Sequence, residues 1–575
     1  MLDRMIRARF GWLAVLSVLV AVNLLSTVFH MRLDLTEERR FTLSEPTRRL
    51  VRELDGPVEV TVLLDGDMPA GFQKLANATR DLLNDLRDIA PDRVNFTFAR
   101  PASEADDSTR AVVYDSLQQL GINPTNVKAQ TKQGEGTEET LLFAGAVIRH
   151  GDRTVGVDLL SGQSQLSGIE SLNNAEALLE YRFADAIRKV VRQTVPLVGY
   201  LAGNGEPLDY RIYDLIEQTL RPNYAFRIIP IDSVTHIPSD FSAICVVKPM
   251  RPFTDAQKLK IDQYVMRGGR VVWMLDNLYA SLDSLQRSEG SFIAFDLGLN
   301  LEDLLFRYGA RVNRDLVQDL QNDGIPSVIG QMGDKPQIEV LPWPYYPLLR
   351  HNGRHPIAKN MDYVLSKFPQ SIDTVKAPGI RKTILLTTSP TARSLPTPAQ
   401  VEWESIRTED DLASFRSSDI PVAVLLEGRF SSLYANRLGR AQADSLQAVQ
   451  GTPFLATSGS EGKMVVVGDG DLPLNEISQQ DGPLQMGMNA YTRQQYANRS
   501  FLLNTLEYLT DSTGILETRS KDYTLRLLDD KRVETERLQW QLFDIFGPML
   551  LTLLCIAAWQ YWRKRRFGAT FRKDA

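Results

Sequence analysis

The sequence contains very little cysteine and histidine. Cys245 and Cys555 are the two cysteines, and Cys555 lies inside an apolar run near the C-terminus, so the two side chains are not expected to pair. This excludes a disulfide scaffold but leaves the cellular compartment open. Of the five histidines, only His351 and His355 cluster, and the Gly and Pro around them indicate a loop rather than a metal-binding helix.

The motifs of common enzyme classes are also missing. No stretch has the phosphate-loop form G-x-x-x-x-G-K-[ST], and "GSEGKM" (459–464) lacks both the spacing and the hydroxyl. Cys245 falls in the middle of a predicted strand, not on the strained turn that exposes a nucleophile, which leaves a cryptic hydrolase as a third-ranked alternative. We therefore expect no enzymatic activity, no cofactor and no bound metal.

No part of the chain has the basic surplus of a nucleic-acid-binding protein. The formal net charge of the 575 residues is −6, and 43% of the residues are hydrophobic while 24% are charged. This is ordinary globular composition, so most of the chain should fold around apolar cores. The length allows about two to four domains of roughly 150 residues.

What the sequence does have is two membrane-length apolar runs, one near each end. Residues 10–29 include no charged side chain, and 542–562 end in Trp559, Tyr561 and Trp562 before a basic cluster. A helix of about 20 residues spans roughly the 30 Å of a bilayer core. We expect a transmembrane helix at each end.

Two alternatives bear on these runs. A cleavable signal peptide is disfavoured for the first, because its apolar core exceeds the usual ~7–15 residues and no small-x-small site follows. A buried core helix is disfavoured for the second by the basic residues beyond Trp562. Those residues predict that both termini are cytoplasmic, at the inner membrane of a bacterium, with the large central region in the periplasm.

Between the two runs, the periodicity predicts two successive α/β units. The first has the order β-α-β-α-β-β-α, which is that of a thioredoxin-like domain. A helix capped by Ser44 precedes it, a hairpin turns at Gly151-Asp152, and an amphipathic helix over 173–191 ends it. Its first strand–helix junction, "LDGDMPAGF", has no Cys-x-x-Cys, so we expect a redox-inactive scaffold. The second alternates strands and helices like a flavodoxin or a class I glutamine amidotransferase core. We expect helices over 209–220 and 254–269, the latter capped by Thr254, and a later strand over 421–428.

The expected organisation follows from these patterns. The segments are a cytoplasmic tail (1–9), a transmembrane helix (10–30), a junction (31–43), the thioredoxin-like domain (44–193), the flavodoxin- or amidotransferase-like domain with insertions (194–512), a stem (513–540), a second transmembrane helix (541–562) and a basic cytoplasmic tail (563–575).

Polar residues follow two predicted strands of the second unit, 195–203 and 463–469. Ligands of doubly wound sheets bind beyond such strand ends, while ordinary Asp-Gly turn chemistry is the alternative reading of 467–475. The candidate ligand residues are Asn204, Glu206, Asp469 and Asp471.

A proline- and aromatic-rich stretch, "WPYYP" (343–347), indicates a possible partner surface. Aromatic residues are enriched at interfaces, although they also pack loops internally. The candidate contact residues are Trp343, Tyr345 and Tyr346.

The junction "RLDLTEERRFTLS" (32–44) resembles a motif that follows the first membrane helix in the GldG family, the gliding-motility-associated ABC-transporter accessory proteins of Bacteroidetes. The resemblance continues in order through nearly the whole chain. It includes "GEP", "FTDAQKLKIDQYVMRGGRVVWMLD", "WPYYPLL", "HPIAKNMDYVLSKFPQSIDT", "KTILLTTSP", "PVAVLLEGRF", "KMVVVGDGDLPLN" and "QYANRSFLLNTLEYLTDSTGILETRSKDYTLRLLD". The α/β part is also similar to an intraflagellar-transport protein domain.

The resemblance implies partners rather than catalysis. They are an ABC-2-type permease (GldF-like), a cytoplasmic ATPase (GldA-like) and the bilayer itself, while homo-oligomerisation is left open. We expect a double-anchored accessory subunit whose junctions transmit movement. The alternative is a periplasmic solute- or glycan-binding protein that uses the strand-end loops. The junction residues that match the family motif are Arg32, Asp34, Leu35, Thr36, Glu37, Thr42 and Ser44.

Overall fold

The computed structural model describes most of the chain between residues 42 and 520, together with two helical segments outside it. The described residues are 16–21, 42–66, 68–102, 106–130, 137–160, 168–288, 290–332, 335–352, 355–404, 406, 408–439, 441, 442, 444, 447, 448, 451–511, 513–520 and 530–567. The chain divides into one compact unit, Met1–Lys521, and a second unit, Asp522–Ala575.

The first domain is built on a four-stranded sheet with the order β2-β1-β5-β6. Strands β1 and β2 are parallel, whereas β5 and β6 run antiparallel to their neighbours and turn at Gly151. Its elements are α3 (Glu45–Arg52), β1 (Val58–Val62), α4 (Ala70–Ile89), β2 (Val94–Phe98), α5 (Asp107–Gln119), β3 (Pro124–Gln130), β4 (Thr137–Phe143), β5 (Gly145–His150), β6 (Arg153–Asp158), α6 (Gly168–Ala177) and α7 (Leu179–Val191).

The second domain is built on a ten-stranded mixed sheet. Its path is β15-β16-β19-β22-β23-β10-β9-β7-β8, with β17 paired to β16. Strands β8, β7, β9, β10 and β23 are parallel and lie side by side in that order, which is the 2-1-3-4-5 order of a flavodoxin-like sheet. The strands from β22 to β15 extend the sheet in antiparallel fashion.

The strands of that sheet are β7 (Leu197–Ala202), β8 (Ala225–Pro230), β9 (Phe241–Val247), β10 (Val271–Met274), β15 (Asn322–Met332), β16 (Lys335–His351), β17 (Val364–Leu365), β19 (Ile380–Thr387), β22 (Pro421–Gly428) and β23 (Gly462–Val467). Smaller pairings are made by β11 (Leu278–Tyr279), β12 (Ser291–Asp296), β13 (Ala310–Val312), β14 (Asp315–Asp319), β18 (Ile372–Thr374), β20 (Ala392–Pro396), β21 (Ala399–Glu402), β24 (Ile477–Ser478) and β25 (Gly482–Pro483).

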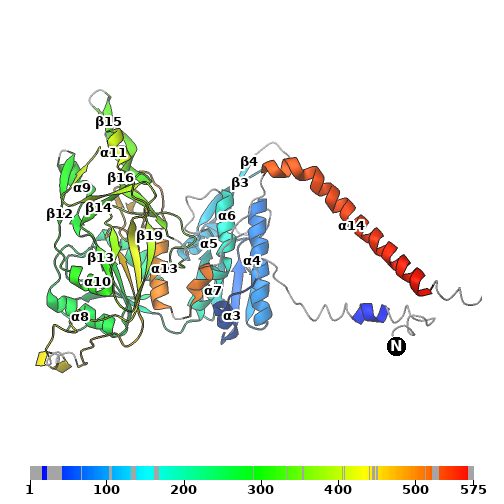
Figure 1. The fold of residues 1–575 in the computed structure, drawn as a ribbon, viewed down its shortest axis with the longest axis horizontal. Coiled ribbons are helices and arrows are strands. Elements are labelled where there is room, and N and C mark those ends of the chain that lie inside the picture. The colour runs from blue at the N-terminus through cyan, green and yellow to red at the C-terminus, as the bar shows by residue number, and fades with distance from the viewer. Residues whose placement is uncertain are drawn as a thin grey trace, which may run out of the picture. The chain divides into compact units, whose positions relative to one another are not determined.

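Helices cover the sheet of the second domain on both faces. One apolar core holds α13 and the other α8 and α10. Because both of their faces are covered, the buried strands β9 and β10 are apolar except at Ser242 of β9. The helical elements are η1 (Tyr210–Ile212), η2 (Asp214–Leu220), α8 (Asp255–Met266), α9 (Leu282–Arg287), α10 (Glu302–Tyr308), α11 (Glu409–Ala413), α13 (Asn498–Thr510) and η3 (Ile515–Ser520) (Figure 1).

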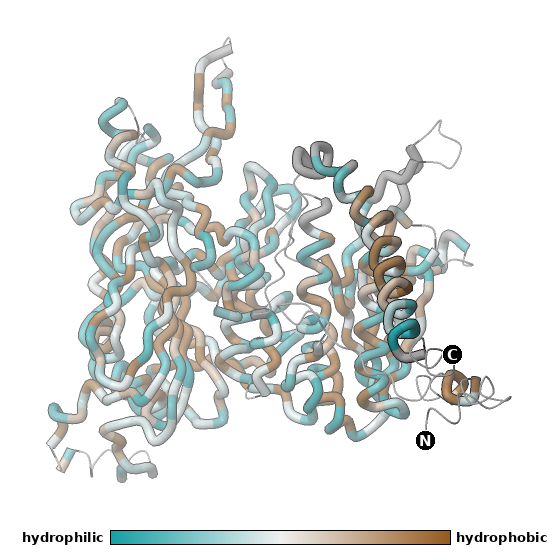
Figure 2. The backbone as a smooth tube through the Cα atoms, turned by 45° about the vertical axis from the view of Figure 1, so that its right-hand side comes forward, coloured by the Kyte–Doolittle hydropathy of each residue, from teal (hydrophilic) through white to brown (hydrophobic). Residues whose placement is uncertain are grey.

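The C-terminal helix α14 (Asp530–Phe567) is continuous from the charged segment into the apolar one. Figure 2 shows a hydrophobic band along it, and Gln539–Arg565 is long and apolar enough to cross a membrane. Residues 530–540 of the predicted stem are thus part of the same helix as the apolar segment. Of the predicted N-terminal transmembrane helix, the structure describes only residues 16–21, which are helical; the remainder lies outside the described residues.

The α/β class predicted from the sequence is confirmed, whereas the finer relationship of each domain to thioredoxin-like or amidotransferase-like proteins stays a prediction. Several elements differ from expectation. The helix expected over 209–220 is a 3-10 turn followed by a wide π-helical segment. The stretch around "WPYYP" belongs to the long strand β16.

Candidate functional site at the carboxyl edge of the sheet

Five parallel strands end at one edge of the second sheet, and the loops after four of them hold the candidate residues. The loops after β7, β9, β10 and β23 begin at Gly203, Lys248, Leu275 and Gly468. Because parallel strands present their carboxyl ends together, the polar residues of these loops converge although they are far apart in sequence.

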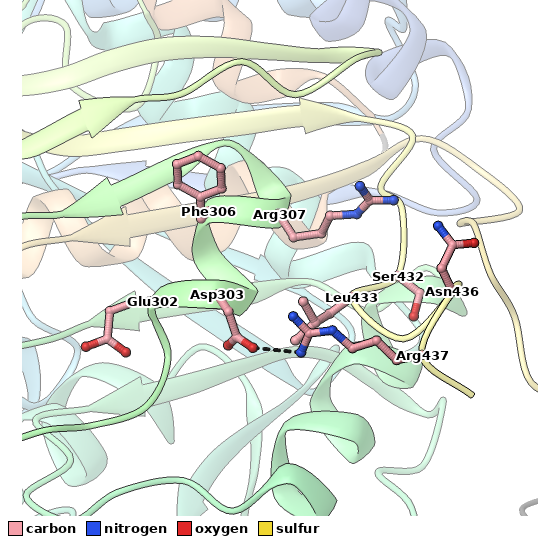
Figure 3. Close-up of a pocket in the computed structure, with 8 residues that line it drawn as sticks. All are labelled: Glu302, Asp303, Phe306, Arg307, Ser432, Leu433, Asn436 and Arg437. Atoms are coloured by element: carbon pink, nitrogen blue, oxygen red, sulfur yellow. Dashed lines mark hydrogen bonds and ion pairs between the residues drawn. The ribbon is translucent and has the colours of Figure 1, made fainter. Parts of the chain in front are cut away.

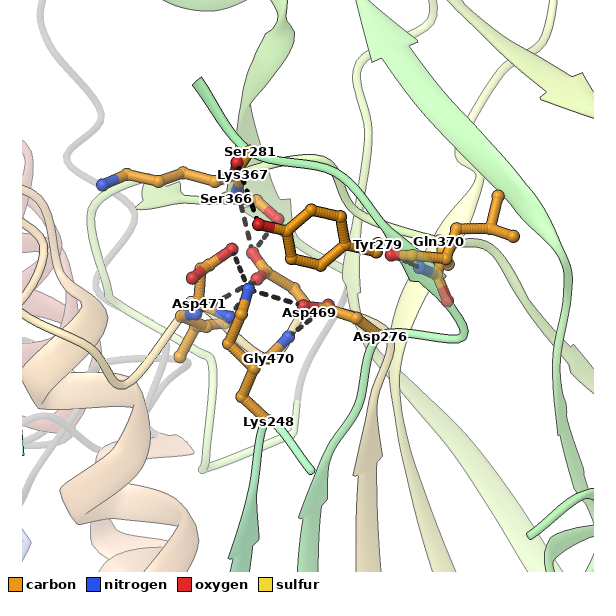
Figure 4. A network of polar contacts seen from close by, with 12 residues as sticks. Lys248, Asp276, Tyr279, Ser281, Ser366, Lys367, Gln370, Asp469, Gly470 and Asp471 are labelled. Atoms are coloured by element: carbon orange, nitrogen blue, oxygen red, sulfur yellow. Dashed lines mark hydrogen bonds and ion pairs between the residues drawn. The ribbon is translucent and has the colours of Figure 1, made fainter. Parts of the chain in front are cut away.

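A buried lysine is the centre of this edge (Figure 4). The Nζ of Lys248 lies 2.7 Å from Oδ2 of Asp276 and 2.5 Å from Oδ2 of Asp471. The two carboxylates raise the pKa of Lys248 against the effect of its burial. Lys248 also has a left-handed backbone, with φ of 42°, which is a strained conformation for a residue with a side chain.

Gly470 allows the loops to meet. Its N–H donates to Oδ1 of Asp276 at 2.7 Å. A Cβ at this position would lie 2.9 Å from Cβ of Lys248 and 3.0 Å from Oδ2 of Asp276, too close for any other residue without displacing the ion pair.

Asp469 holds the β23 loop and the segment before β18 together. Its Oδ1 accepts from the backbone N–H of Asp471 at 2.7 Å and of Leu472 at 3.1 Å. Its Oδ2 accepts from the hydroxyl of Ser366 and, at 2.9 Å, from the N–H of Lys367. Burial, followed by the charges of Asp276 and Asp471, raises the pKa of Asp469 to about 7.

Asn204 and Glu206 lie at the point where the strand order reverses, between β7 and β9. The backbone carbonyl of Asn204 accepts from Met250 and Arg251, both at 2.8 Å. Oε2 of Glu206 accepts from the N–H groups of Gly203 and Asn204 at 2.9 and 2.7 Å. Two buried acceptors, Oδ1 of Asn204 and Oε1 of Glu206, have no protein partner, and burial raises the pKa of Glu206.

These loops therefore use most of their polar groups on one another. Asp471 and Lys248 keep some exposure, at 21% and 11% of the side chain, whereas Asn204 and Asp469 are buried. The arrangement can tie the strand ends together and exchange a proton near neutral pH. A ligand role for Asn204, Glu206, Asp469 and Asp471 stays a prediction.

The prediction that the aromatic stretch 343–347 forms a partner surface is wrong, because its aromatic side chains are buried. Trp343, Tyr345 and Tyr346 are 2%, 1% and 4% exposed, and all three pack against Phe368. The proline residues of β16 do not turn this stretch into a surface loop, because β16 pairs with β15 up to Pro342 and again at Pro347, and the three aromatic residues lie in the irregular register between these two points. The hydrophobic effect then turns the large rings inward.

Two surface hollows lie elsewhere on the second domain. One, of about 530 Å³, is lined by residues of α10 and of the loop after β22, and an ion pair between Arg437 and Asp303 at 2.9 Å crosses it (Figure 3). The other, of about 940 Å³, lies beside the β15–β16 hairpin and is lined partly by Trp343 and Trp403.

The cysteine and the histidine considered as candidate enzymatic groups both lie in buried surroundings. Cys245 lies fully buried within β9, and burial raises the pKa of its thiol to about 12. His355 packs edge-on against Tyr508, and burial lowers its pKa to about 4. In the part of the chain that the structure describes, no three His, Cys, Asp or Glu residues are grouped as metal ligands.

Of the seven junction residues, Thr42 and Ser44 are described, and Arg32, Asp34, Leu35, Thr36 and Glu37 lie outside the described residues. Ser44 caps α3 as predicted, since its Oγ accepts from the N–H of Thr47. Its own N–H donates to Oε1 of Glu180 at 2.7 Å, which ties the junction to α7.

Sequence reasoning missed Lys248 and Asp276. Both lie at the carboxyl ends of stretches that read as strands, "AICVVKP" (243–249) and "RVVWMLD" (270–276), so their strand-end position was a usable signal. The ion pair between Lys248 and Asp276 could not be predicted, because it depends on the order of the strands in the sheet.

The comparisons with known proteins cover most of both domains. The model of a family described as "ABC-type uncharacterized transport system" matches residues 196–505, and that of a domain of unknown function (DUF7088) matches residues 37–149. No curated protein matches the chain. Among solved structures, the chain is similar to one titled "mmIFT52 N-terminal domain", at 14% identity and a TM-score of 0.30, over 55% of this chain and 98% of that one.

Proposed function

Because the chain belongs to the family of the ABC-type uncharacterized transport system, we propose that it is a non-enzymatic accessory subunit that couples an extracytoplasmic body to a partner permease. The observation that carries this proposal is the extent of the family match, which runs from the start of the second domain to α13. A match over 196–505 concerns the whole fold of the domain rather than one motif.

The membrane part of the proposal rests on α14. This helix has the length and composition of a membrane span, and with the transport family it indicates membrane association. We further propose the finer arrangement implied by the sequence: a second anchor at 10–30, both termini in the cytoplasm, the two α/β domains in the periplasm, a GldF-like permease and a GldA-like ATPase, and a link to gliding motility.

The closed chemistry of the sheet edge supports a non-enzymatic role. The Lys248 ammonium is shared by Asp276 and Asp471, and Asp469 accepts four hydrogen bonds, two from its own loop and two from the segment after β17. Such groups fix the loops instead of facing a substrate.

Photo-crosslinking in the native membrane tests the partner. A photoreactive residue replaces Leu553 or Trp559, both exposed along α14, and the adduct is identified by mass spectrometry. We expect a polytopic permease. Adducts with lipid alone, from both positions, would contradict the assignment, and the same residue placed at exposed Glu461 of the body serves as the control.

The junction gives a second test of coupling. Replacing 34–43 by a glycine-rich linker should impair transport-linked activity, because a slack junction does not transmit force, while expression and membrane insertion stay normal. Unchanged activity would reject coupling but not membership of the complex.

A further inference from the structure

The two domains are joined by a helix that belongs to both of them. One stripe of α7, formed by Leu179, Phe183, Ile187 and Val190, is buried in the core of the first domain. Tyr181, on the opposite stripe, is buried in the core of the second domain, where α7 packs against η3 and the Tyr181 hydroxyl reaches Glu507 of α13. Figure 1 shows α7 beside α13. A helix with both faces buried in this way cannot separate from either domain without exposing a core.

Buried charges lock the same contact. Nη2 of Arg188 lies 2.5 Å from Oδ1 of Asp185 on its own helix and 2.5 Å from Oε1 of Glu507 on α13, and Nη1 lies 3.6 Å from Oδ1 of Asp511. The Arg188 side chain is 12% exposed and that of Glu507 is 6% exposed. The hydroxyl of Tyr181 donates to the other oxygen of Glu507 at 2.7 Å.

The two domains together, residues 42–520, are called the body here, and both ends of the body contact α7. At the entry, the N–H of Ser44 donates to Glu180 of α7. At the exit, the guanidinium of Arg519 in η3 stacks over the ring of Tyr181, 5.0 Å from its centroid, and donates to Asn504 at 3.0 Å. The chain therefore enters and leaves the body beside one helix.

We propose that α7 is a clasp that fuses the two domains and both ends of the body into one rigid unit, with Arg188 as its central residue. The covalent link between the domains is only the exposed segment Gln193–Val195, which by itself would allow a hinge. With the clasp closed, a displacement at either end moves the whole body. This inference stands on the contacts of α7 and does not depend on which permease is the partner.

Pulsed electron paramagnetic resonance on the full-length protein in detergent tests the clasp. Spin labels are attached to Asp88→Cys on α4 and Ala256→Cys on α8, both exposed positions, in a Cys555→Ser background that leaves only the buried Cys245. We expect one narrow distance distribution for the parent protein and a broad one for Arg188→Met. A broad parent distribution, or an Arg188→Met distribution as narrow as the parent's, would overturn the proposal.

Matched variants guard against global unfolding. Arg381→Met removes an arginine from an ion pair with Glu427, at a side chain that is 72% exposed and within one domain; it should leave the distribution narrow. If Arg188→Met fails to fold, Glu507→Leu decides, since it removes both of the oxygens to which Arg188 and Tyr181 donate, whether or not the carboxyl is protonated. Trypsin gives an independent readout: cleavage after Arg192 should become at least about tenfold faster in the clasp variants, because proteolysis follows the population of opened molecules.

Discussion

At the residue scale, two networks of buried charge, around Lys248 at the sheet edge and around Arg188 on α7, connect segments that are far apart in the sequence. Lys248 is the counter-charge for Asp276 and Asp471 at the sheet edge. Replacing one member of a buried ion pair leaves the others uncompensated, which costs about 3–5 kcal/mol. Lys248→Met should therefore lower the unfolding free energy of the full-length protein by that amount.

Thermal and chemical unfolding in detergent, followed by circular dichroism, measures this change. Arg381→Met is the matched control, and its exposed pair should contribute no more than about 1 kcal/mol. If the two variants were equally stable, the ion pairs of Lys248 would not be what holds the strand-end loops together.

The pH dependence of stability is the second prediction at this scale. The pKa values of Asp469 and Glu507 are both about 7 in the folded chain, raised by burial from their ordinary values. A raised acid takes up a proton on folding, so stability falls as the pH rises from about 4 to about 7 and is constant above that interval. The protein should be more stable at pH 5.5 than at pH 8.

Each group should contribute about 1–2 kcal/mol of this difference. Melting curves of the parent, Asp469→Asn and Glu507→Gln at the two pH values measure it. Each variant should flatten the pH profile, and a parent protein that is equally or less stable at pH 5.5 would show that the sign is wrong.

At the scale of elements, local patterns predicted most strands and helices, because these depend on near neighbours in the sequence. The strand 421–428 and the helix capped by Thr254 are found where they were expected, and Thr254 makes a full capping box with Gln257. The long strand β16 was missed because its prolines indicate a loop, whereas pairing with β15 overrides them.

The aromatic residues of β16 give the prediction for this scale. Trp343 is buried and Ile338, on the same strand, is 61% exposed. Trp343→Ala should cost about 3–5 kcal/mol of stability, as for large core residues, and Ile338→Ala no more than about 0.5 kcal/mol. If both variants lost the same small amount of unfolding free energy, the burial of Trp343 would be contradicted.

At the scale of the whole molecule, two α/β domains and the strand-end loops could be predicted from the sequence, but the contacts between these parts could not. Asp469 and Asp471 were candidates, yet their partners Lys248 and Asp276 come from strands that become neighbours only in the folded sheet. Likewise, the helical period of 173–191 predicted a helix, but not that Tyr181 and Phe183 enter different cores. Such pairings are long-range, and no local period encodes them.

The central claim is that this protein works as a subunit of an ABC-type transport system. The most direct test is mild-detergent purification of the tagged full-length chain from its native membrane, with the subunit ratio measured by quantitative mass spectrometry. We expect a polytopic permease and an ATPase in a fixed ratio to this chain across repeated preparations. Recovery of the chain alone, or only with copies of itself, would contradict it.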